Sequence, residues 1–248
     1  MFKDLMIAFS MFSKLPVPIY EWKEKKGPNA QMFFPVVGTV CGLVLFITHM
    51  ILNYFNVVYE IASFIMLMSN FLVCGFLHID GLMDVSDALL SARDKQTRLR
   101  ILKDSTVGAF SVVIVCMVIL GLYITNLVMF ELQIMPVLFL IVCTLSRVFG
   151  SIIVFILKPI TNNGIMFYFK DGTKVLHKVF MGVLFIVLVF VAYLINCTYA
   201  ISIIGATIFC VILTAKCKKS FGGINGDVIG ANIILFELSS YIIVCLIG

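Results

Sequence analysis

Seven long apolar runs, separated by polar segments, dominate the pattern of hydrophobic and polar positions along the chain. They cover residues 33–53, 58–78, 108–129, 135–157, 179–197, 199–215 and 228–247. A helix needs ~20 apolar residues to cross the hydrocarbon core of a bilayer, and most of these runs approach that length. The pattern therefore predicts about seven transmembrane helices.

Two shorter features complete this outline. Residues 2–14 alternate apolar and polar positions at helical spacing, but they are too few and too charged to span, so they predict an N-terminal interfacial helix. The sixth run follows the fifth after a very short turn around Asn196. These two runs are therefore predicted to form a tight helical hairpin.

Composition supports lipid as the main solvent of the chain. Of the 248 residues, 62% are hydrophobic and only 12% are charged, and the mean hydropathy is +1.13. A soluble domain of this length carries about twice that charge. We therefore expect one all-α, polytopic integral membrane domain over residues 1–248. No secretory signal peptide is recognisable, and the eight cysteines form no C-x-x-C pair, which argues against zinc and disulfide frameworks.

The distribution of basic residues predicts the orientation. Of the 18 Lys and Arg residues, 17 lie in the N-terminal segment and in the segments 79–107, 158–178 and 216–227. Seven spans place all four segments on one side, which the positive-inside rule makes cytoplasmic. The net charge of +5 is then explained by topology and anionic lipid, so we expect no nucleic-acid partner.

Three aspartates at the end of the second run are the strongest chemical signal. Asp80, Asp84 and Asp87 are spaced i, i+4 and i+7, which puts them on one face of a helix at ~100° per residue. Like charges at this spacing repel unless a cation neutralises them. Magnesium prefers carboxylates together with substrate phosphates. The stripe therefore predicts a divalent-metal site, although a solvated acidic helix end would show the same spacing.

Other polar residues next to apolar runs are candidates for the same chemistry. Ser105, together with Lys103 and Asp104, precedes the third run, where a helix N-terminus favours an anion. Gly226 and Asp227 close a glycine-rich turn before the last run, and glycines let backbone approach a phosphate. Capping alone would also explain both segments.

Arg147 lies near the middle of the fourth run. An ionisable residue at that depth is a functional candidate, and its guanidinium suits phosphate. Glu237, within the last run, is either its partner or a separate buried acid.

Taken together, these motifs resemble those of the cobalamin synthases, the adenosylcobinamide-GDP ribazoletransferases. The resemblance runs through almost the whole chain in order and spacing. It is carried by Phe33–Gly38, His78–Asp87, Arg93-Asp94, Lys103–Ser105 with Gly108, Leu145–Arg147, and Gly222-Gly223 through Gly226-Asp227 to Gly230-Ala231.

The resemblance implies a magnesium-dependent reaction of adenosylcobinamide-GDP with α-ribazole or its 5′-phosphate. The products are adenosylcobalamin, or its phosphate, and GMP. It also implies a bacterial or archaeal cell membrane, and as partners a lipid bilayer, a second copy of the chain or other cobalamin-assembly enzymes. On this hypothesis Asp80 and Asp84 bind Mg²⁺, with Asp104 and Asp227 as further ligands, and Asp87 is a ligand or, slightly favoured, the general base. The candidates for substrate binding are Lys103, Ser105, Arg147 and Gly226.

Two other interpretations remain open. A lipid enzyme of the CDP-alcohol phosphotransferase class would use similar chemistry, but its D-x-x-D-G-x-x-A-R order is absent. A transporter would use Arg147 and Glu237 along an ion path. The acidic residues, however, crowd one predicted membrane face rather than the midplane where transporters bind substrates.

Overall fold

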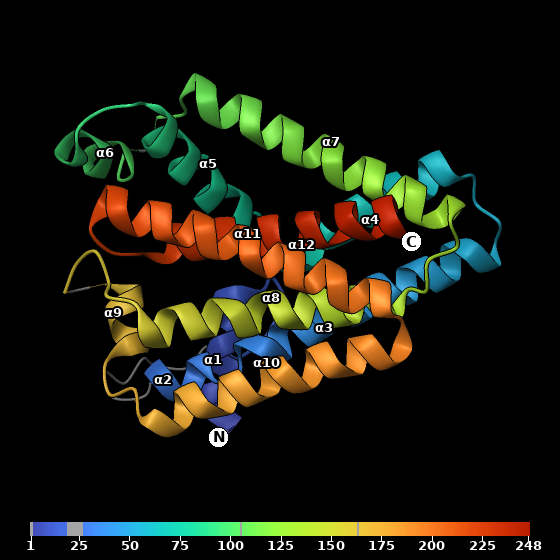
Figure 1. Cartoon of the computed structure of the whole chain (residues 1–248), viewed down its shortest axis with the longest axis horizontal. Helices are drawn as coiled ribbons and strands as arrows, with labels where there is room; N and C mark the ends of the chain where they lie inside the picture. Colours follow the sequence, from blue (N-terminus) through green and yellow to red (C-terminus); the bar gives the residue numbers. More distant parts are fainter. Residues whose placement is uncertain (1, 19–26, 105, 163) are drawn as a thin grey trace.

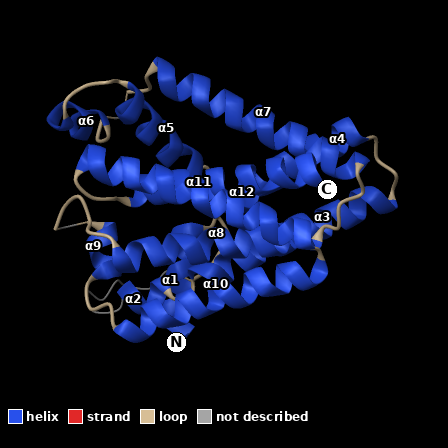
Figure 2. Cartoon of the chain, in the orientation of Figure 1, coloured by secondary structure: helices blue, strands red, loops and turns tan. Residues whose placement is uncertain are grey.

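The computed structural model describes residues 2–18, 27–104, 106–162 and 164–248, and this part of the chain is folded into helices with one isolated β-bridge (Figure 2). The all-α prediction is thus confirmed. In chain order the helices are α1 (Phe2–Phe12), α2 (Gly27–Gln31), α3 (Phe34–Tyr54), α4 (Tyr59–Cys74), α5 (Leu77–Leu90), α6 (Lys95–Ile101), α7 (Ala109–Glu131), α8 (Val137–Ile156), α9 (Ile165–Lys170), α10 (Val175–Ile195), α11 (Cys197–Phe221) and α12 (Gly226–Ile247).

Six helices in the described part of the chain are long and apolar enough to cross a membrane, or seven spans if α4 and α5 count together as one. Their outer faces are strongly apolar. In α10, for example, only Met181 and Ala192 are buried, and large apolar side chains cover the rest of the helix. Water would not tolerate so continuous an apolar surface, so lipid must cover it. The prediction of a polytopic membrane protein is confirmed.

The second predicted span is not one straight helix. It breaks at Gly75, whose φ of +68° is a left-handed conformation that glycine adopts without strain. The amide of Gly75 closes α4 by donating to the carbonyl of Phe71 at 2.8 Å. Helix α5 then continues at 92° to α4. The prediction of one continuous helix over residues 58–78 is therefore wrong at its C-terminal end. The segment 79–107, predicted as polar, contains most of α5 and all of α6.

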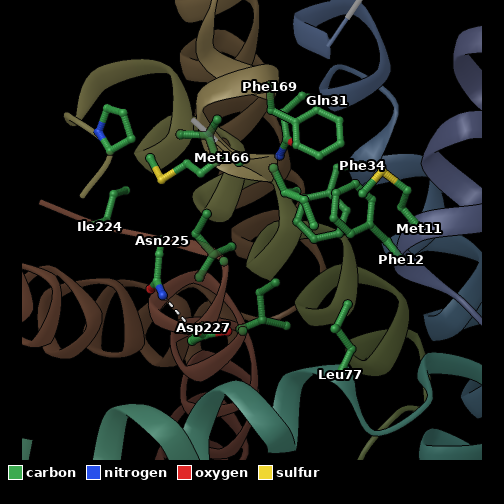
Figure 3. Close-up of a pocket in the computed structure, with 18 of the residues that line it drawn as sticks. Met11, Phe12, Gln31, Phe34, Leu77, Met166, Phe169, Ile224, Asn225 and Asp227 are labelled. Atoms are coloured by element: carbon green, nitrogen blue, oxygen red, sulfur yellow. Dashed lines mark hydrogen bonds between the residues drawn. The ribbon is translucent and has the colours of Figure 1, made fainter. Parts of the chain in front are cut away.

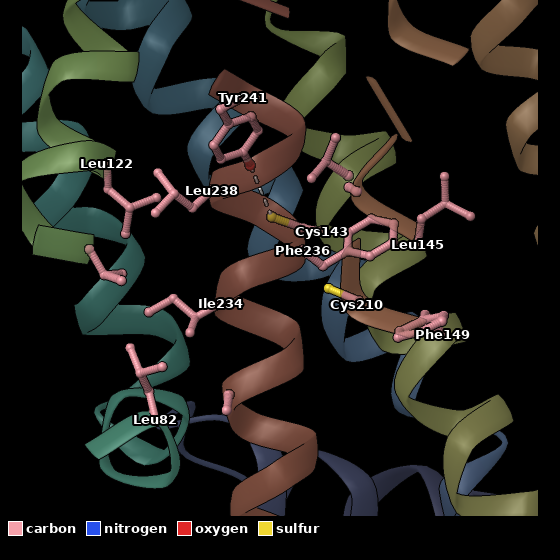
Figure 4. Packing of buried hydrophobic residues seen from close by; sticks show 14 of the residues in the cluster. Leu82, Leu122, Cys143, Leu145, Phe149, Cys210, Ile234, Phe236, Leu238 and Tyr241 are labelled. Atoms are coloured by element: carbon pink, nitrogen blue, oxygen red, sulfur yellow. Dashed lines mark hydrogen bonds between the residues drawn. The ribbon is translucent and has the colours of Figure 1, made fainter. Parts of the chain in front are cut away.

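Two glycines of α3 allow this helix to pack with its backbone in close contact with that of α8. A Cβ on Gly38 of α3 would lie 2.3 Å from the carbonyl oxygen of Cys143 in α8, and one on Gly42 would lie 2.7 Å from Cα of Leu140. Small residues at this spacing are a common device for packing transmembrane helices. On the other side of the bundle, α12 packs against α5 and α7 through Ile234, Leu238, Leu82 and Leu122 (Figure 4).

Helix α1 confirms the predicted short amphipathic element. It buries Ile7, Ala8 and Phe9. Its last residue, Phe12, packs on Phe34 of α3 at a ring-centroid distance of 4.2 Å and on Phe169 of α9 at 5.4 Å. The apolar face of α1 is therefore held by protein side chains.

The predicted tight hairpin between residues 179–197 and 199–215 is also confirmed, because only Asn196 separates α10 from α11. Its side chain accepts a hydrogen bond from the amide of Thr198 at 2.9 Å and so caps α11. Figure 1 shows this turn at the end of the bundle opposite α2, α6 and α9. The basic segments that contain α6 and α9 thus lie at the end of the bundle opposite the hairpin turn.

This arrangement allows a direct test of the predicted orientation. Cys197 is exposed at the hairpin turn, so a membrane-impermeant maleimide is expected to label it in intact cells. A cysteine introduced as Lys95→Cys in α6 is expected to react only after permeabilisation. Cys116, exposed on α7, is replaced by Ser in both chains to remove background. Labelling of the Lys95→Cys chain in intact cells, with Cys197 protected, would reverse the assigned orientation.

Candidate active site

The three aspartates predicted to share a helix face do so on α5, and all three line one cavity. This cavity, called the acidic cavity below, has a volume of about 310 Å³. Its walls are α5, the segment that precedes α7, and the first turn of α7. Its lining residues are Asp80, Met83, Asp84, Asp87, Leu102, Lys103, Asp104, Thr106, Val107 and Ser111.

A fifth carboxylate, that of Asp227, reaches this region from α12, because α5 and α12 cross in close contact at Gly81. A Cβ on Gly81 would lie 2.8 Å from both Cα and the carbonyl oxygen of Asp227, so no larger residue fits without moving the helices. The crossing brings Asp227 within electrostatic reach of Asp80 and Asp84. Sequence reasoning recognised Gly81 only as part of a motif and missed this role.

Asp87 makes two hydrogen bonds that the sequence did not predict. One carboxylate oxygen accepts from the amide of Gly108 at 2.8 Å and the other from the amide of Ser111 at 3.0 Å. Asp87 therefore caps the N-terminus of α7, where a negative charge is favourable. A Cβ on Gly108 would come within 2.4 Å of the Asp87 carboxylate, which explains the glycine at that position.

The predicted anion site before α7 is thus occupied by a carboxylate of the protein itself. Ser105 lies outside the described residues. Its neighbour Thr106 does not cap α7: its amide and hydroxyl donate to Asp104 at 3.0 and 2.8 Å. These two hydrogen bonds lower the pKa of the Asp104 carboxyl, so it stays ionised at the edge of the acidic cavity. Lys103 lines the same cavity and is its basic residue.

The donor set of the acidic cavity fits a hard divalent cation. The charged groups that act on the Asp84 carboxylate are three further carboxylates, those of Asp227, Asp80 and Asp87. Within the described ranges, however, no group of three or more His, Cys, Asp or Glu side chains is placed to hold a metal ion. Magnesium often takes one or two carboxylates and fills its remaining positions with water and substrate phosphates, so an open acidic site suits it.

A second, larger cavity of about 440 Å³ lies beside the same crossing (Figure 3). It is called the apolar cavity below. Helix α5 contributes Leu77 and His78 to it, while its aspartates face the acidic cavity. The other lining residues are Met11, Phe12, Gln31, Phe34, Val154, Pro159, Ile160, Thr161, Gly164, Ile165, Met166, Phe169, Ile224, Asn225, Gly226, Asp227, Ile229, Gly230 and Ile233.

The glycine-rich turn fixes the polar end of the apolar cavity. Gly222 ends α11 with a φ of +83°. Ile224 then pairs with the segment after α8, donating to the carbonyl of Lys158 at 3.0 Å and accepting from the amide of Ile160 at 2.9 Å. A Cβ on Gly226 would meet nothing within 4 Å, so there is open space beside its backbone.

The two residues that flank Gly226 are linked to each other. The Asn225 side chain accepts from the amide of Val228 at 3.1 Å and so caps α12. Its amide group also donates to the Asp227 carboxylate (Figure 3). Asp227 is therefore held where it lines the apolar cavity while its charge acts on the acidic cavity. Sequence reasoning identified Asp227 but not the residue that positions it.

The structure does not bring Arg147 to either cavity. Its guanidinium is 1% exposed and forms an ion pair with Glu237, the partner considered from the sequence. It also donates to Ser146 at 2.9 Å, to the carbonyl of Cys143 at 3.2 Å and to the thiol of Cys74 at 3.4 Å. These contacts join α4, α8 and α12 inside the bundle, which is a structural role rather than the predicted contact with a diphosphate.

Comparisons with known proteins bear on this arrangement. A family model described as cobalamin-5-phosphate synthase matches residues 4–245. A protein of Clostridium perfringens named adenosylcobinamide-GDP ribazoletransferase is 33% identical over 247 residues, covering 99% of this chain and 98% of its own. Proteins of the same name from Clostridium botulinum and Alkaliphilus oremlandii are 34% and 32% identical, covering 99% and 97% of this chain and 98% of their own lengths. No solved structure matches.

Proposed function

Because this chain belongs to the cobalamin-5-phosphate synthase family, we propose that it joins adenosylcobinamide-GDP to α-ribazole, or to α-ribazole 5′-phosphate, at the cytoplasmic face of the membrane. The observation that carries the proposal is the acidic cavity, where α5 and the segment before α7 bring carboxylates together and Asp227 of α12 acts on them electrostatically. Such a site suits phosphoryl transfer, which requires positioning and charge neutralisation more than covalent chemistry.

The proposed reaction exchanges one phosphorus–oxygen bond for another. A hydroxyl of the ribazole ribose attacks the phosphorus that is attached to the cobinamide, and the bond from this phosphorus to the bridging oxygen breaks. GMP leaves with the bridging oxygen, and the hydroxyl proton passes to a carboxylate. In the 5′-phosphate form the 5′ oxygen is already esterified, so the attacking hydroxyl belongs to the ribose ring.

Each residue of the acidic cavity has a proposed role. Asp80 and Asp84 would hold magnesium, with Asp104 and Asp227 as further ligands; when bound, the ion neutralises charge on the transferring phosphate. Asp87 is proposed to accept the hydroxyl proton, since each of its oxygens keeps a free lone pair beside its single hydrogen bond. The ammonium of Lys103 would bind the diphosphate from the same wall.

The test is to incubate the purified protein with adenosylcobinamide-GDP, α-ribazole and magnesium and to measure released GMP. The expected result is GMP in equal amount to the cobalamin formed, with none when α-ribazole is omitted. Parallel reactions with α-ribazole 5′-phosphate establish which form is preferred. Absence of GMP release with both forms would reject the proposed reaction.

Replacing Asp84 by Asn is expected to weaken the apparent affinity for magnesium by at least ~10–100-fold, because loss even of groups outside the metal's own ligands typically costs that much. Rate as a function of magnesium concentration measures this, and excess magnesium should restore much of the rate. Asp171→Asn is the matched control, since Asp171 is exposed at the end of α9, outside the acidic cavity. An unchanged magnesium dependence in the Asp84→Asn protein would remove Asp84 from the metal site.

A further inference from the structure

The apolar cavity has the size and the lining of a site for a small, largely apolar molecule. Figure 3 shows Met166 and Phe169 along one wall, with Phe34 and Phe12 beside Phe169, while the polar end is formed by Asn225 and Asp227. A volume of about 440 Å³ lies within the ~300–1,000 Å³ that is typical of small-molecule sites. A corrin ring with its side chains and upper ligand is several times larger than a nucleoside and does not fit.

One polar group in the wall of this cavity lacks a partner. The His78 side chain is 7% exposed, and neither ring nitrogen has a hydrogen-bond partner in the described structure. Buried polar groups are normally hydrogen-bonded, and an unmade bond costs ~1–3 kcal/mol. Gln31, on the same cavity, differs because its amide donates to Ser151 at 3.1 Å. His78 therefore has hydrogen-bonding capacity that no described protein group uses.

We propose that the apolar cavity binds the aromatic base of the incoming ribazole, with its ribose directed toward Asp227. This inference rests on the proposed function and assigns one of its two substrates to a place. The base is a flat bicyclic ring in which one nitrogen carries the ribose and the other is a single hydrogen-bond acceptor. A neutral imidazole has one N–H donor, so His78 can donate one hydrogen bond to this nitrogen of the base.

The position of Asp227 connects this cavity to the chemistry. Asp227 lines the apolar cavity and acts electrostatically on Asp80 and Asp84, which line the acidic cavity. A ribose held at the Asp227 end therefore presents its hydroxyls toward the carboxylates. Gly226, with open space at its Cβ position, leaves room for the sugar to approach the backbone.

The cavity suits the ribazole base better than guanine, the other base in the reaction. The edges of guanine carry acceptors at O6 and N7 and a donor at N2, each of which requires a partner when buried. The walls between Phe12 and Met166 are mainly aliphatic and aromatic. On entering this cavity, guanine would give up more hydrogen bonds to water than the cavity walls can replace.

The test measures α-ribazole binding directly, by equilibrium dialysis of the purified protein without its second substrate. Replacing His78 by Phe is expected to weaken binding about 5–10-fold, the usual worth of one net hydrogen bond of ~1 kcal/mol. Met166→Trp, which fills the cavity, is expected to weaken it by more than tenfold. Binding of GMP is expected to be unchanged in both variants.

His49→Phe is the matched control. His49 is also buried, at 5% exposure, and also lacks partners for both ring nitrogens, but it stacks on Phe130 at a centroid distance of 4.3 Å and lines neither cavity. The His49→Phe protein is expected to bind α-ribazole as the wild type does. Equal thermal midpoints of the wild-type, His78→Phe and Met166→Trp proteins exclude misfolding.

Different results would overturn the proposed binding site and the proposed reaction. The inference is overturned if wild-type protein shows no saturable α-ribazole binding, if folded His78→Phe and Met166→Trp proteins bind α-ribazole normally, or if they lose GMP instead. In turnover, the inference requires a raised KM for α-ribazole with an unchanged KM for adenosylcobinamide-GDP. Wild-type protein that binds α-ribazole through His78 but releases no GMP would reject the reaction and leave the binding site standing.

Discussion

Replacing Asp87 by Asn is expected to lower turnover by ~10²–10⁴-fold, the usual loss when a general base is removed. Raising magnesium should not restore the rate, and the apparent affinity for magnesium should stay nearly unchanged. Measuring the rate as a function of magnesium concentration gives both results.

The hydrogen bonds of Asp87 make a control necessary, because the same substitution weakens the cap of α7. Loss of a cap costs ~0.5–2 kcal/mol of stability, which the thermal midpoint reports. Asp94→Asn is the matched control: Asp94 caps α6 through the amides of Gln96 and Thr97 and lines neither cavity. If magnesium rescues the Asp87→Asn protein, Asp87 is a metal ligand and the base lies elsewhere.

Replacing Arg147 by Met is expected to destabilise the protein by ~3–5 kcal/mol, because it leaves the Glu237 carboxylate buried without its partner. The double variant Arg147→Met with Glu237→Met should regain much of this loss, since it removes both charges. A dye that fluoresces on reaction with thiols follows unfolding through the buried Cys41, Cys210 and Cys217.

Arg100→Met is the control for loss of a guanidinium, since Arg100 is exposed on α6. Its thermal midpoint should match that of the wild type. If the Arg147→Met protein is as stable as the wild type yet binds adenosylcobinamide-GDP weakly, Arg147 contacts substrate after all. The structural role assigned to its ion pair would then be wrong.

The features predicted correctly from the sequence are those encoded by local spacing. A transmembrane helix must be long enough to cross the bilayer, so the length of an apolar run indicates where the helix begins and ends. The observed bounds of α3 and α12 lie within one or two residues of the predicted runs. The aspartate stripe follows from helical periodicity alone. The ion pair between Arg147 and Glu237 could be predicted as a possibility, because a charged group within the membrane needs a partner.

The features that were missed depend on contacts between distant segments. Apolar residues continue on both sides of Gly75, so hydrophobic periodicity carries no sign of the 92° bend. The capping of α7 by Asp87 depends on how α5 meets α7, and the role of Gly81 depends on α12. His78 stands directly before the aspartate stripe in the sequence, but only the fold reveals that it is buried without a partner.

The close crossing of α5 and α12 has a consequence for how the protein is made. Six helices separate the two along the described chain, so α5 leaves the ribosome well before Asp227 is synthesised. During that interval its aspartates lack the neighbouring helix, and their charge opposes entry into the bilayer core. The carboxylate of Asp227 therefore joins those of α5 only when α12 docks against Gly81, so the full set of carboxylates is assembled late in synthesis.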